Sequence, residues 1–272
     1  MPVCSYSFKP KRSLGQNFLV DDNIARKVVR SLHLDKRDVF LEIGPGQGAL
    51  TRHLADNVRH LVAVEIDGRA AEELQRTFVS PSVTILHADF LTVELSDLHK
   101  EYGSKLRVIG NIPYHLTSPI LFKVFDQHLF VRDVTTMMQK EVAERLVARP
   151  GTKDCGILSV FCLFFGVAKI LFTVSPNCFY PKPKVTSAVV QMSLHEKLAE
   201  SVDADIFKTI VKTAFGKRRK TLRNSLKFLP FDENIVADIL SHVTIPLKAR
   251  AEELTLEQWV QLTKEVDKCR TG

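Results

Sequence analysis

The feature that most constrains the fold is a unit repeated through the first 150 residues: a short apolar run that stops at glycine, an acid or asparagine, followed by a helical segment. The first run, 39–43, stops at Gly44-Pro45-Gly46, which predicts a buried strand entering a tight turn. Strands that alternate with helices in one sheet are joined by right-handed crossovers. We therefore predict an α/β fold, a parallel sheet with helices on both faces, with further strands at 61–66, 83–86, 106–109 and 134–138.

The same patterns predict two domains. Helices are expected at 49–55, 69–78, 119–125, 141–147 and 156–165. Strands are expected at 170–174 and 187–192, and the closely spaced prolines of 179–184 predict an ordered loop between them. Beyond residue 194 only helices are indicated, at 204–215, 221–229, 233–240 and 256–266, the last with a capping box from Thr255 and Gln258. We expect an α/β domain over residues 1–193, with a basic N-terminal arm, and a small all-helical domain over 194–272.

Composition excludes several classes of protein. With 45% hydrophobic and 25% charged residues, the chain has the make-up of a globular protein rather than a disordered one. Five cysteines without a C-x-x-C pair indicate free thiols rather than a disulfide framework or a zinc site, so we expect no metal. No apolar run approaches the roughly 20 residues of a membrane helix, and the first residues lack the apolar core of a secretion signal. We expect a cytoplasmic protein.

Glycines at 44, 46 and 48 follow the first strand, in Glu42-Ile-Gly-Pro-Gly-Gln-Gly48. Glycine lets the backbone approach a ligand closely at the carboxyl end of a strand. The spacing also fits the loose dinucleotide fingerprint, and a plain tight turn is the alternative. Because a strand and a helix flank it as the fingerprint requires, we favour a nucleoside-cofactor site that includes Gly44 and Gly46.

Acidic residues stand at the ends of the next two strands. Glu65 ends the second strand, where a carboxylate can accept both hydroxyls of a ribose. Asp89 follows the third strand, where an acid suits the amino group of an adenine better than it suits hydride transfer. Either acid alone would be read as a surface residue beginning a loop.

The segment Asn111-Ile-Pro-Tyr114 follows the fourth strand. The exocyclic amine of adenine is a poor nucleophile because its lone pair is delocalised into the ring. The amide oxygen of Asn111 and a main-chain carbonyl can accept its two hydrogens and align the nitrogen with a methyl donor. The proline stiffens the turn, and Tyr114 offers a ring for the base to stack on. We expect Asn111, Ile112 and Tyr114 to be catalytic rather than a helix cap and core residues.

A second aromatic residue, Phe179, precedes the Pro181-Lys-Pro-Lys184 loop. It is a candidate for closing the other face of a flipped base, with Lys182 and Lys184 on phosphate. On its own this segment would be read as a packed loop aromatic with solvated lysines.

Basic residues are concentrated in one window. Eight lie between residues 208 and 227, with no acid among them, so this window alone exceeds the +7 of the whole chain. Such a run exceeds what solubility requires and indicates a surface that contacts phosphate. A smaller basic cluster lies in the first 12 residues. The RNA-binding candidates are Lys217, Arg218, Arg219, Lys220 and Arg223.

These segments, taken in order, resemble the ribosomal RNA adenine N6-dimethyltransferase family over nearly the whole chain, and its small-subunit members most. The resemblance rests on seven motifs: 15–19, 42–51, 64–67, 88–90, 111–114, 179–190 and 215–225. It implies a Rossmann-like class I S-adenosylmethionine-dependent methyltransferase domain followed by a helical RNA-binding domain. By the family's pattern, the cofactor-binding residues are Asn17, Leu19, Gly44, Gly46, Glu65, Asp89 and Asn111.

The function implied by the resemblance is specific. The family places two methyl groups on each of two adjacent adenosines in the 3′-terminal hairpin of small-subunit (16S) ribosomal RNA, so we expect the immature small subunit as partner, and a monomeric enzyme. Ile112 departs from the leucine more frequent in these members and occurs in macrolide-resistance methylases of large-subunit RNA, which stay an alternative. Two further hypotheses stay open: an RNA-binding ribosome assembly factor and a nicotinamide-dependent dehydrogenase.

Overall fold

The computed structural model describes residues 9–195, 201–217, 220–229, 233–246 and 248–271. The chain separates into two compact units, one of residues Met1–Ala143 with Lys169–Leu194, the other of Glu144–Ala168 with His195–Gly272. The division therefore also falls near residue 194. It differs from the predicted domains in residues 144–168, which the sequence assigned to the first domain.

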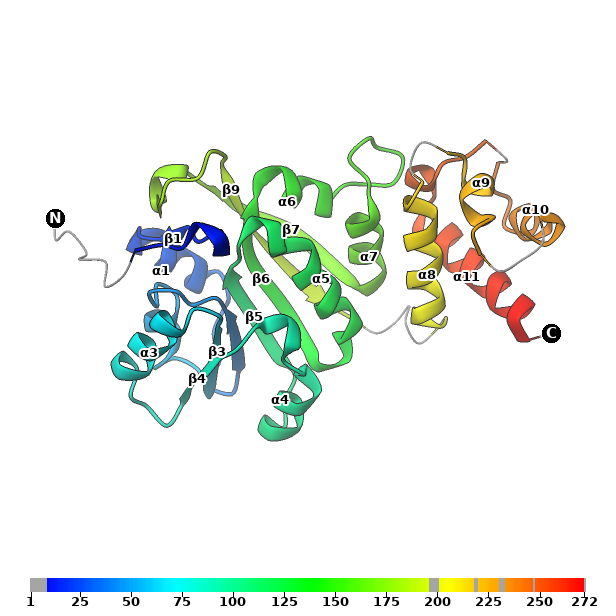
Figure 1. Ribbon diagram of the computed structural model, residues 1–272. Helices are drawn as coiled ribbons and strands as arrows, with labels where there is room; N and C mark the ends of the chain where they lie inside the picture. Colours follow the sequence, from blue (N-terminus) through cyan, green and yellow to red (C-terminus); the bar gives the residue numbers. More distant parts are fainter. Residues whose placement is uncertain (1–8, 196–200, 218–219, 230–232, 247, 272) are drawn as a thin grey trace. The chain divides into compact units, whose positions relative to one another are not determined.

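The first unit is built on a seven-stranded sheet with the order β4-β3-β2-β5-β6-β9-β7 (Figure 1). The first five strands in this order, β4-β3-β2-β5-β6, pair in parallel, which confirms the predicted α/β fold. Strand β9 runs antiparallel to β6. The strands are β2 Val39–Ile43, β3 His60–Glu65, β4 Val83–His87, β5 Leu106–Asn111, β6 Val131–Gln139, β7 Gly166–Val174 and β9 Ser187–Leu194.

Four elements of this unit were not predicted. Helix α1 (Asp22–Arg30) begins after Asp21, whose side chain accepts hydrogen bonds from two backbone amides of its first turn. Helix α4 (Leu95–Tyr102) ends at Gly103, where φ is +63°. Strands β1 (Phe18–Leu19) and β8 (Phe179–Tyr180) pair with each other. The remaining helices up to the unit boundary are α2 Thr51–Leu54, α3 Gly68–Thr77, α5 Thr117–Asp126 and α6 Lys140–Leu146.

The parallel register brings the carboxyl ends of β2, β3, β4 and β5 to one edge of the sheet. From β2 the chain continues through β3 and β4 on one side, and then returns to add β5 and β6 on the other. In open α/β sheets this reversal leaves a crevice beyond the strand ends. The glycine turn and the three polar strand ends predicted from the sequence therefore converge on the same place.

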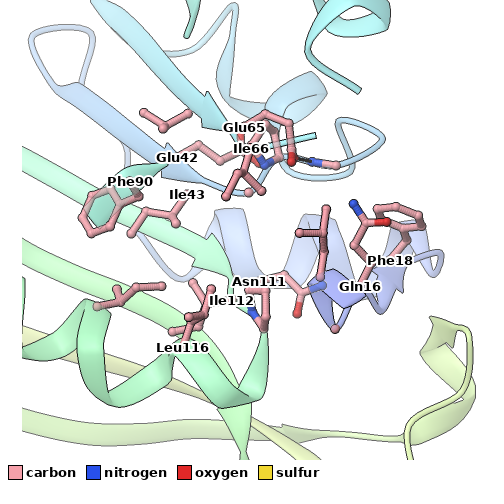
Figure 2. Close-up of a pocket in the computed structure, with 18 of the residues that line it drawn as sticks. Gln16, Phe18, Glu42, Ile43, Glu65, Ile66, Phe90, Asn111, Ile112 and Leu116 are labelled. Atoms are coloured by element: carbon pink, nitrogen blue, oxygen red, sulfur yellow. Dashed lines mark hydrogen bonds between the residues drawn. The ribbon is translucent and has the colours of Figure 1, made fainter. Parts of the chain in front are cut away.

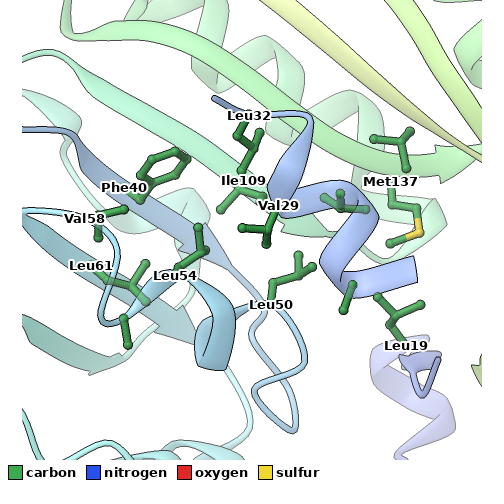
Figure 3. Packing of buried hydrophobic residues seen from close by; sticks show 14 of the residues in the cluster. Leu19, Val29, Leu32, Phe40, Leu50, Leu54, Val58, Leu61, Ile109 and Met137 are labelled. Atoms are coloured by element: carbon green, nitrogen blue, oxygen red, sulfur yellow. The ribbon is translucent and has the colours of Figure 1, made fainter. Parts of the chain in front are cut away.

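One face of the sheet is covered by a continuous apolar cluster. Phe40, Leu61, Ile109 and Met137 come from four strands of the sheet. Against them pack residues of α1 and α2, among them Val29 and Leu54 (Figure 3). Leu19 and Phe179, the paired residues of β1 and β8, belong to the same cluster. The two-stranded ribbon is thus fixed by apolar burial as well as by backbone pairing.

The amino ends of the strands are joined by a buried ion network. Arg107 donates to Asp38 at 2.6 Å and to Asp133 at 2.9 Å, and also to the carbonyl of Leu32 at 2.8 Å. All three charged side chains are at most 8% exposed. A buried guanidinium with charged partners on both sides fixes the register of β2, β5 and β6 at the edge opposite the strand ends described above.

The second unit is helical. Its core contains Phe164 of α7, which stacks on Phe207 of α8 with ring centroids 3.7 Å apart, and Trp259 of α11, which lies against Phe215. Thr255 and Gln258 form the predicted capping box of α11, each side chain bonding the other's backbone amide. The helices are α7 Ile157–Phe165, α8 Ala204–Phe215, α9 Leu222–Leu226, α10 Glu233–His242 and α11 Leu256–Thr271.

Two further observations bear on function. None of the helices formed by the described residues is long and apolar enough to cross a bilayer. Over the same residues, no group of three or more histidine, cysteine, aspartate or glutamate side chains is arranged to hold a metal ion.

Candidate cofactor and substrate site

A pocket lies at the carboxyl ends of β2, β3 and β5, where the strand order reverses. Figure 2 shows side chains from these strand ends and from the N-terminal residues around a common space. That space, its open mouth included, is about 1010 Å³, a size suited to a cofactor with part of a substrate. Of the predicted residues it is lined by Asn17, Leu19, Gly44, Gly46, Glu65, Asp89, Asn111, Ile112 and Tyr114.

The glycine turn after β2 requires glycine for two different reasons. Gly44 and Gly46 have φ of +62° and +58°, a region that other residues rarely adopt. A Cβ on Gly44 would meet no atom within 4 Å, so this part of the backbone is open to the pocket. A Cβ on Gly46 would lie 2.8 Å from the ring of Phe18. The turn is therefore shaped both by its own backbone and by the N-terminal residues that pack on it.

Glu65 is held rigidly at the end of β3. Its two carboxylate oxygens accept backbone hydrogen bonds from Gly46 and from Asp67, both at 2.9 Å. The residue is 3% exposed, and burial raises the pKa of its carboxyl against the lowering effect of these two bonds. Each oxygen keeps a lone pair, so the group can still accept the two hydroxyls of a ribose.

Glu42 is a second buried acid in the pocket wall, and it was not among the site residues predicted from the sequence. Thr51 donates to its carboxyl at 2.7 Å. Burial raises the pKa of Glu42 to about 7, opposed by the bond from Thr51 and reinforced by the nearby charge of Glu65. An acid inside an apolar strand run is the signal that would have found it.

Asp67 ties the N-terminal residues to the pocket. Its carboxylate accepts from Lys11 at 3.1 Å, from Gln16 at 3.2 Å and from Arg69 at 2.6 Å. Arg69 also donates to the carbonyl of Lys9 at 3.3 Å. The adjacent Arg69 guanidinium, with Lys11 and Gln16, holds the pKa of Asp67 well below its usual range. In the predicted ribose motif 64–67, residues 64–66 thus line the pocket, and Asp67 anchors the N-terminal residues.

The amide of Asn111 has a defined orientation. Its Nδ2 donates to the backbone carbonyl of Asn17 at 2.7 Å. The Asn17 side chain in turn donates to the carbonyl of Gly15 at 3.1 Å. With its NH₂ group engaged by the N-terminal residues, Asn111 keeps its Oδ1 as a hydrogen-bond acceptor in the pocket. This is the atom that the predicted mechanism requires for holding an amine.

The turn after Asn111 is likewise fixed. Ile112 is 1% exposed and lines the pocket. The hydroxyl of Tyr114 hydrogen-bonds Ser187 at 2.8 Å, and burial raises the pKa of this phenol. The bond to β9 restricts rotation of the aromatic ring. Tyr114 therefore presents a ring of fixed position at the pocket, as stacking on a base requires.

Asp89 follows β4 by two residues. One carboxylate oxygen, Oδ1, accepts the backbone amide of Leu91 at 2.9 Å and begins the short helix η2 (Phe90–Thr92). Asp89 belongs to the pocket lining, together with Glu65 of the neighbouring strand. The structure thus brings together the two acids that were predicted from separate strands.

Comparison with known proteins decides the family. Residues 7–268 match the family model described as ribosomal RNA adenine dimethylase. The chain belongs to the ribosomal RNA adenine dimethylase family. It is therefore an enzyme, a methyltransferase, and the resemblance seen in its motifs is confirmed.

Relatives in this family align over almost the full length of the chain. The "Ribosomal RNA small subunit methyltransferase A" of Caldanaerobacter subterraneus subsp. tengcongensis is 40% identical over 93% of this chain and 96% of its own. The protein of the same name from Chlorobium phaeobacteroides is 44% identical over 94% and 93%. These relatives exclude the nicotinamide-dependent dehydrogenase considered above.

Solved structures confirm the predicted fold class. A dimethyladenosine transferase from Plasmodium falciparum superposes with a TM-score of 0.79 at 23% identity, over 92% of this chain and 98% of that one. The 23S rRNA methyltransferase ErmE superposes with a TM-score of 0.65 at 26% identity, over 92% and 100%. The chain therefore has the Rossmann-like methyltransferase fold with helices at its C-terminal end.

The role predicted for Phe179, closing the other face of a flipped base, stays a prediction. The residue is 4% exposed, belongs to the apolar cluster and does not line the pocket. Its partner across the β1–β8 ribbon, Leu19, belongs to the same cluster and does line the pocket. In this dimethylase the structure brings Asn111, Ile112 and Tyr114 together at the pocket.

The basic window of the dimethylase lies in the second unit. Lys217 has its ammonium 5.5 Å from the ring centroid of Phe228, which is 63% exposed, and Arg223 lies on α9. Arg218 and Arg219 lie outside the described residues. Lys208 pairs at 2.7 Å with Asp205, an acid just before the window. The phosphate-contacting candidates that the structure describes are thus Lys217, Lys220 and Arg223.

Several residues of the site were not predicted from the sequence. Gln16 and Phe18 line the pocket; they lie in the motif 15–19, of which only Asn17 and Leu19 were predicted as site residues, because the segment has no strand or helix periodicity. Ile66 directly follows Glu65 and lines the pocket while 46% exposed. A large apolar residue directly after an acid that ends a strand is a sequence signal that could have been read as one face of a base-binding slot.

Proposed function

We propose that this enzyme transfers methyl groups from S-adenosylmethionine to N6 of two adjacent adenosines in the 3′-terminal hairpin of small-subunit ribosomal RNA, two on each. The observation that carries the proposal is the fixed Asn111 amide, whose Oδ1 remains an acceptor because its Nδ2 is engaged by Asn17. The small-subunit enzymes among its relatives support the choice of RNA over the large-subunit alternative.

The pocket suits S-adenosylmethionine on observations that do not depend on the comparisons. The side-chain amide nitrogen of Gln47 is buried in the lining with no partner among the described residues, so it is available to a ligand. Gly44 leaves open space beside the backbone. Glu65 would hold the ribose, Asp89 the adenine amino group, and residues 44–47 the methionine end. The cofactor supplies an electrophilic methyl group on sulfur.

The residues of this chain then have to hold the adenosine N6 in line with the methyl group. Asn111 Oδ1 accepts one N6 hydrogen, and this orients the nitrogen lone pair along the line of attack. In the first transfer to each adenosine, a main-chain carbonyl of the turn accepts the other hydrogen. In the second transfer the first methyl group stands in place of that hydrogen, and N6 loses one proton in each transfer. The ring of Tyr114, held by Ser187, stacks on the base and limits its motion. Alignment of this kind can supply several kcal/mol of the barrier, on the order of 7–11 kcal/mol in favourable cases.

The test is to incubate the protein with under-methylated small subunits and labelled S-adenosylmethionine, and to map the modified nucleotides. We expect two adjacent dimethyladenosines in the 3′-terminal hairpin. Under-methylated large-subunit RNA, assayed in parallel, should accept no label. Label confined to the large-subunit RNA would overturn the proposal in favour of the alternative.

Substitution of Asn111 tests the mechanism. Asn111→Ala removes the acceptor, so methyl transfer should fall by about 10² to 10³-fold, as for removal of one group aimed at a reacting centre. The dissociation constant for S-adenosylmethionine, measured by calorimetry, should change much less. Asn57→Ala, an exposed asparagine of the same unit that does not line the pocket, is the matched control. Full turnover by Asn111→Ala would refute the assigned role.

A further inference from the structure

Residues 9–19, here called the N-terminal segment, are attached to the first unit at two places. At one end Asp67 receives hydrogen bonds from Lys11 and Gln16. At the other end, Phe18 and Leu19 pair with β8, and Leu19 belongs to the apolar cluster. Between the two attachments, Gly15, Gln16 and Asn17 line the pocket. The segment is therefore a strap across one wall of the site.

The attachment at Asp67 is electrostatically strong. Its carboxylate side chain is fully buried, and it faces the ammonium of Lys11 at 3.1 Å and the guanidinium of Arg69 at 2.6 Å. Charge-assisted hydrogen bonds of this kind are shorter and stronger than neutral ones. The backbone amide of Asp67 also donates to Glu65 at 2.9 Å. The same residue thus joins the strap to the ribose-binding acid.

The strap decides which end of the Asn111 amide faces the pocket. The carbonyl of Asn17 can only accept a hydrogen bond, so it selects the Nδ2 end and leaves Oδ1 for the substrate. If the carbonyl moves away, the amide can rotate by about 180° and present NH₂ to the hydrogens of N6. In that orientation the NH₂ group of Asn111 faces the N–H groups of N6, so no hydrogen bond forms and Oδ1 no longer accepts from the substrate.

We propose that Asp67 is a positioning residue, which acts through Gln16 and the N-terminal segment to hold the Asn17 carbonyl against Asn111 and so orients the catalytic amide. The proposal rests on the proposed function for its catalytic consequence only. The competing explanation is that Asp67 serves α3 alone, since its carboxylate also accepts the Arg69 backbone amide at the start of that helix.

Asp67→Asn separates the two explanations. Asparagine caps a helix as well as aspartate does, so α3 is preserved, while the charge that holds Lys11 and Arg69 is lost. Asp22→Asn is the matched control: it also removes an acid paired with an arginine, Arg26, on a helix outside the pocket lining. Lys11→Gln is a milder second variant, which removes one ion pair from a side chain that is 46% exposed.

The first measurement needs no substrate. We expect trypsin to cleave cofactor-free Asp67→Asn at Lys11 about tenfold faster than the parent protein, because opening of the strap becomes correspondingly easier. Lys11→Gln removes one of two adjacent trypsin sites and leaves the other, Arg12. Its cleavage rate is therefore not comparable with that of the parent protein, and its strap is followed by amide hydrogen exchange at residues 13–17, where protection should fall. Asp22→Asn should match the parent protein in both measurements.

The second measurement is of turnover on under-methylated small subunits with saturating S-adenosylmethionine. For Asp67→Asn we expect kcat to fall by about tenfold to hundredfold, as small displacements of a positioned group do, with a smaller change in KM for the RNA. Lys11→Gln should change kcat in the same direction but less. Unchanged cleavage, or faster cleavage with unchanged kcat, would overturn the proposal. If the parent protein itself fails to methylate small subunits, the proposed function fails, and the proteolysis still reports on the strap.

Discussion

At the scale of single residues, Glu42 and Glu65 show how the same carboxyl group acquires different properties in different surroundings. Glu65 has both oxygens engaged by backbone amides, which favour its charged form against burial. Glu42 has one hydroxyl donor and is almost completely buried, so its carboxyl resists ionisation. Glu65 is therefore suited to accept ribose hydroxyls. Glu42 instead makes the free energy of unfolding of the protein depend on pH.

The raised pKa of Glu42 predicts a pH dependence of stability. Because the folded state holds this proton up to about pH 7 and the unfolded state releases it near 4.5, the free energy of unfolding should fall as pH rises between these values. For a group of this burial the change is about 3 kcal/mol at most. Urea unfolding at about pH 5, 6 and 7.5 should show the parent protein losing stability relative to Glu42→Gln. Glu72→Gln, an exposed acid on α3, is the control. A constant difference between the parent protein and Glu42→Gln would contradict the prediction.

At the scale of elements, the site depends on where strands end and on what then packs on the turns. The turn after β2 places Gly44 toward the pocket and Gly46 under the ring of Phe18. Phe18 belongs to β1, which is held by β8 and the apolar cluster. The glycine turn and the N-terminal segment therefore form a single packed wall, although they are separated in the sequence by α1 and β2.

A pair of glycine substitutions tests this packing. Gly46→Ala and Gly103→Ala both introduce a side chain at a positive φ, which costs about 1–2 kcal/mol. At Gly103 the new Cβ meets nothing within 4 Å, whereas at Gly46 it also displaces Phe18. Gly46→Ala should therefore lose more stability in urea unfolding and should alone weaken S-adenosylmethionine binding in a titration. Equal losses with intact binding in both would show that Phe18 does not couple to the turn.

At the scale of the whole molecule, charge is unevenly distributed along the chain. The window 208–227 holds more positive charge than the net charge of the whole chain. Within it Lys208 pairs with Asp205, and in the N-terminal arm Lys11 pairs with Asp67. Part of the apparent basic surface is thus used for internal contacts. Lys217, Lys220 and Arg223 are the charges of the window that we expect to meet phosphate.

Neutralising these three residues to glutamine should weaken binding of small-subunit RNA without changing which nucleotide is methylated, since phosphate contacts position but do not specify. The plot of log affinity against log salt should become shallower by about 0.7–0.9 for each phosphate that the protein no longer neutralises. Lys264, Lys268 and Arg270 of α11, neutralised together, remove the same charge elsewhere in the unit. If both triple variants bind RNA equally and with equal salt dependence, the window is only a solvated face.

The sequence by itself determined the α/β fold and the positions of Glu65, Asp89 and the Asn111 turn at the strand ends. It could do so because strand periodicity and strand-end chemistry are local, and parallel strands necessarily end at one edge. Only the tertiary structure decided the roles that depend on pairing between distant residues. Leu19 pairs with Phe179 and buries it, and Asp67 binds Lys11 rather than a ligand. These roles follow from burial and charge complementarity between residues far apart in the chain, which no local pattern encodes.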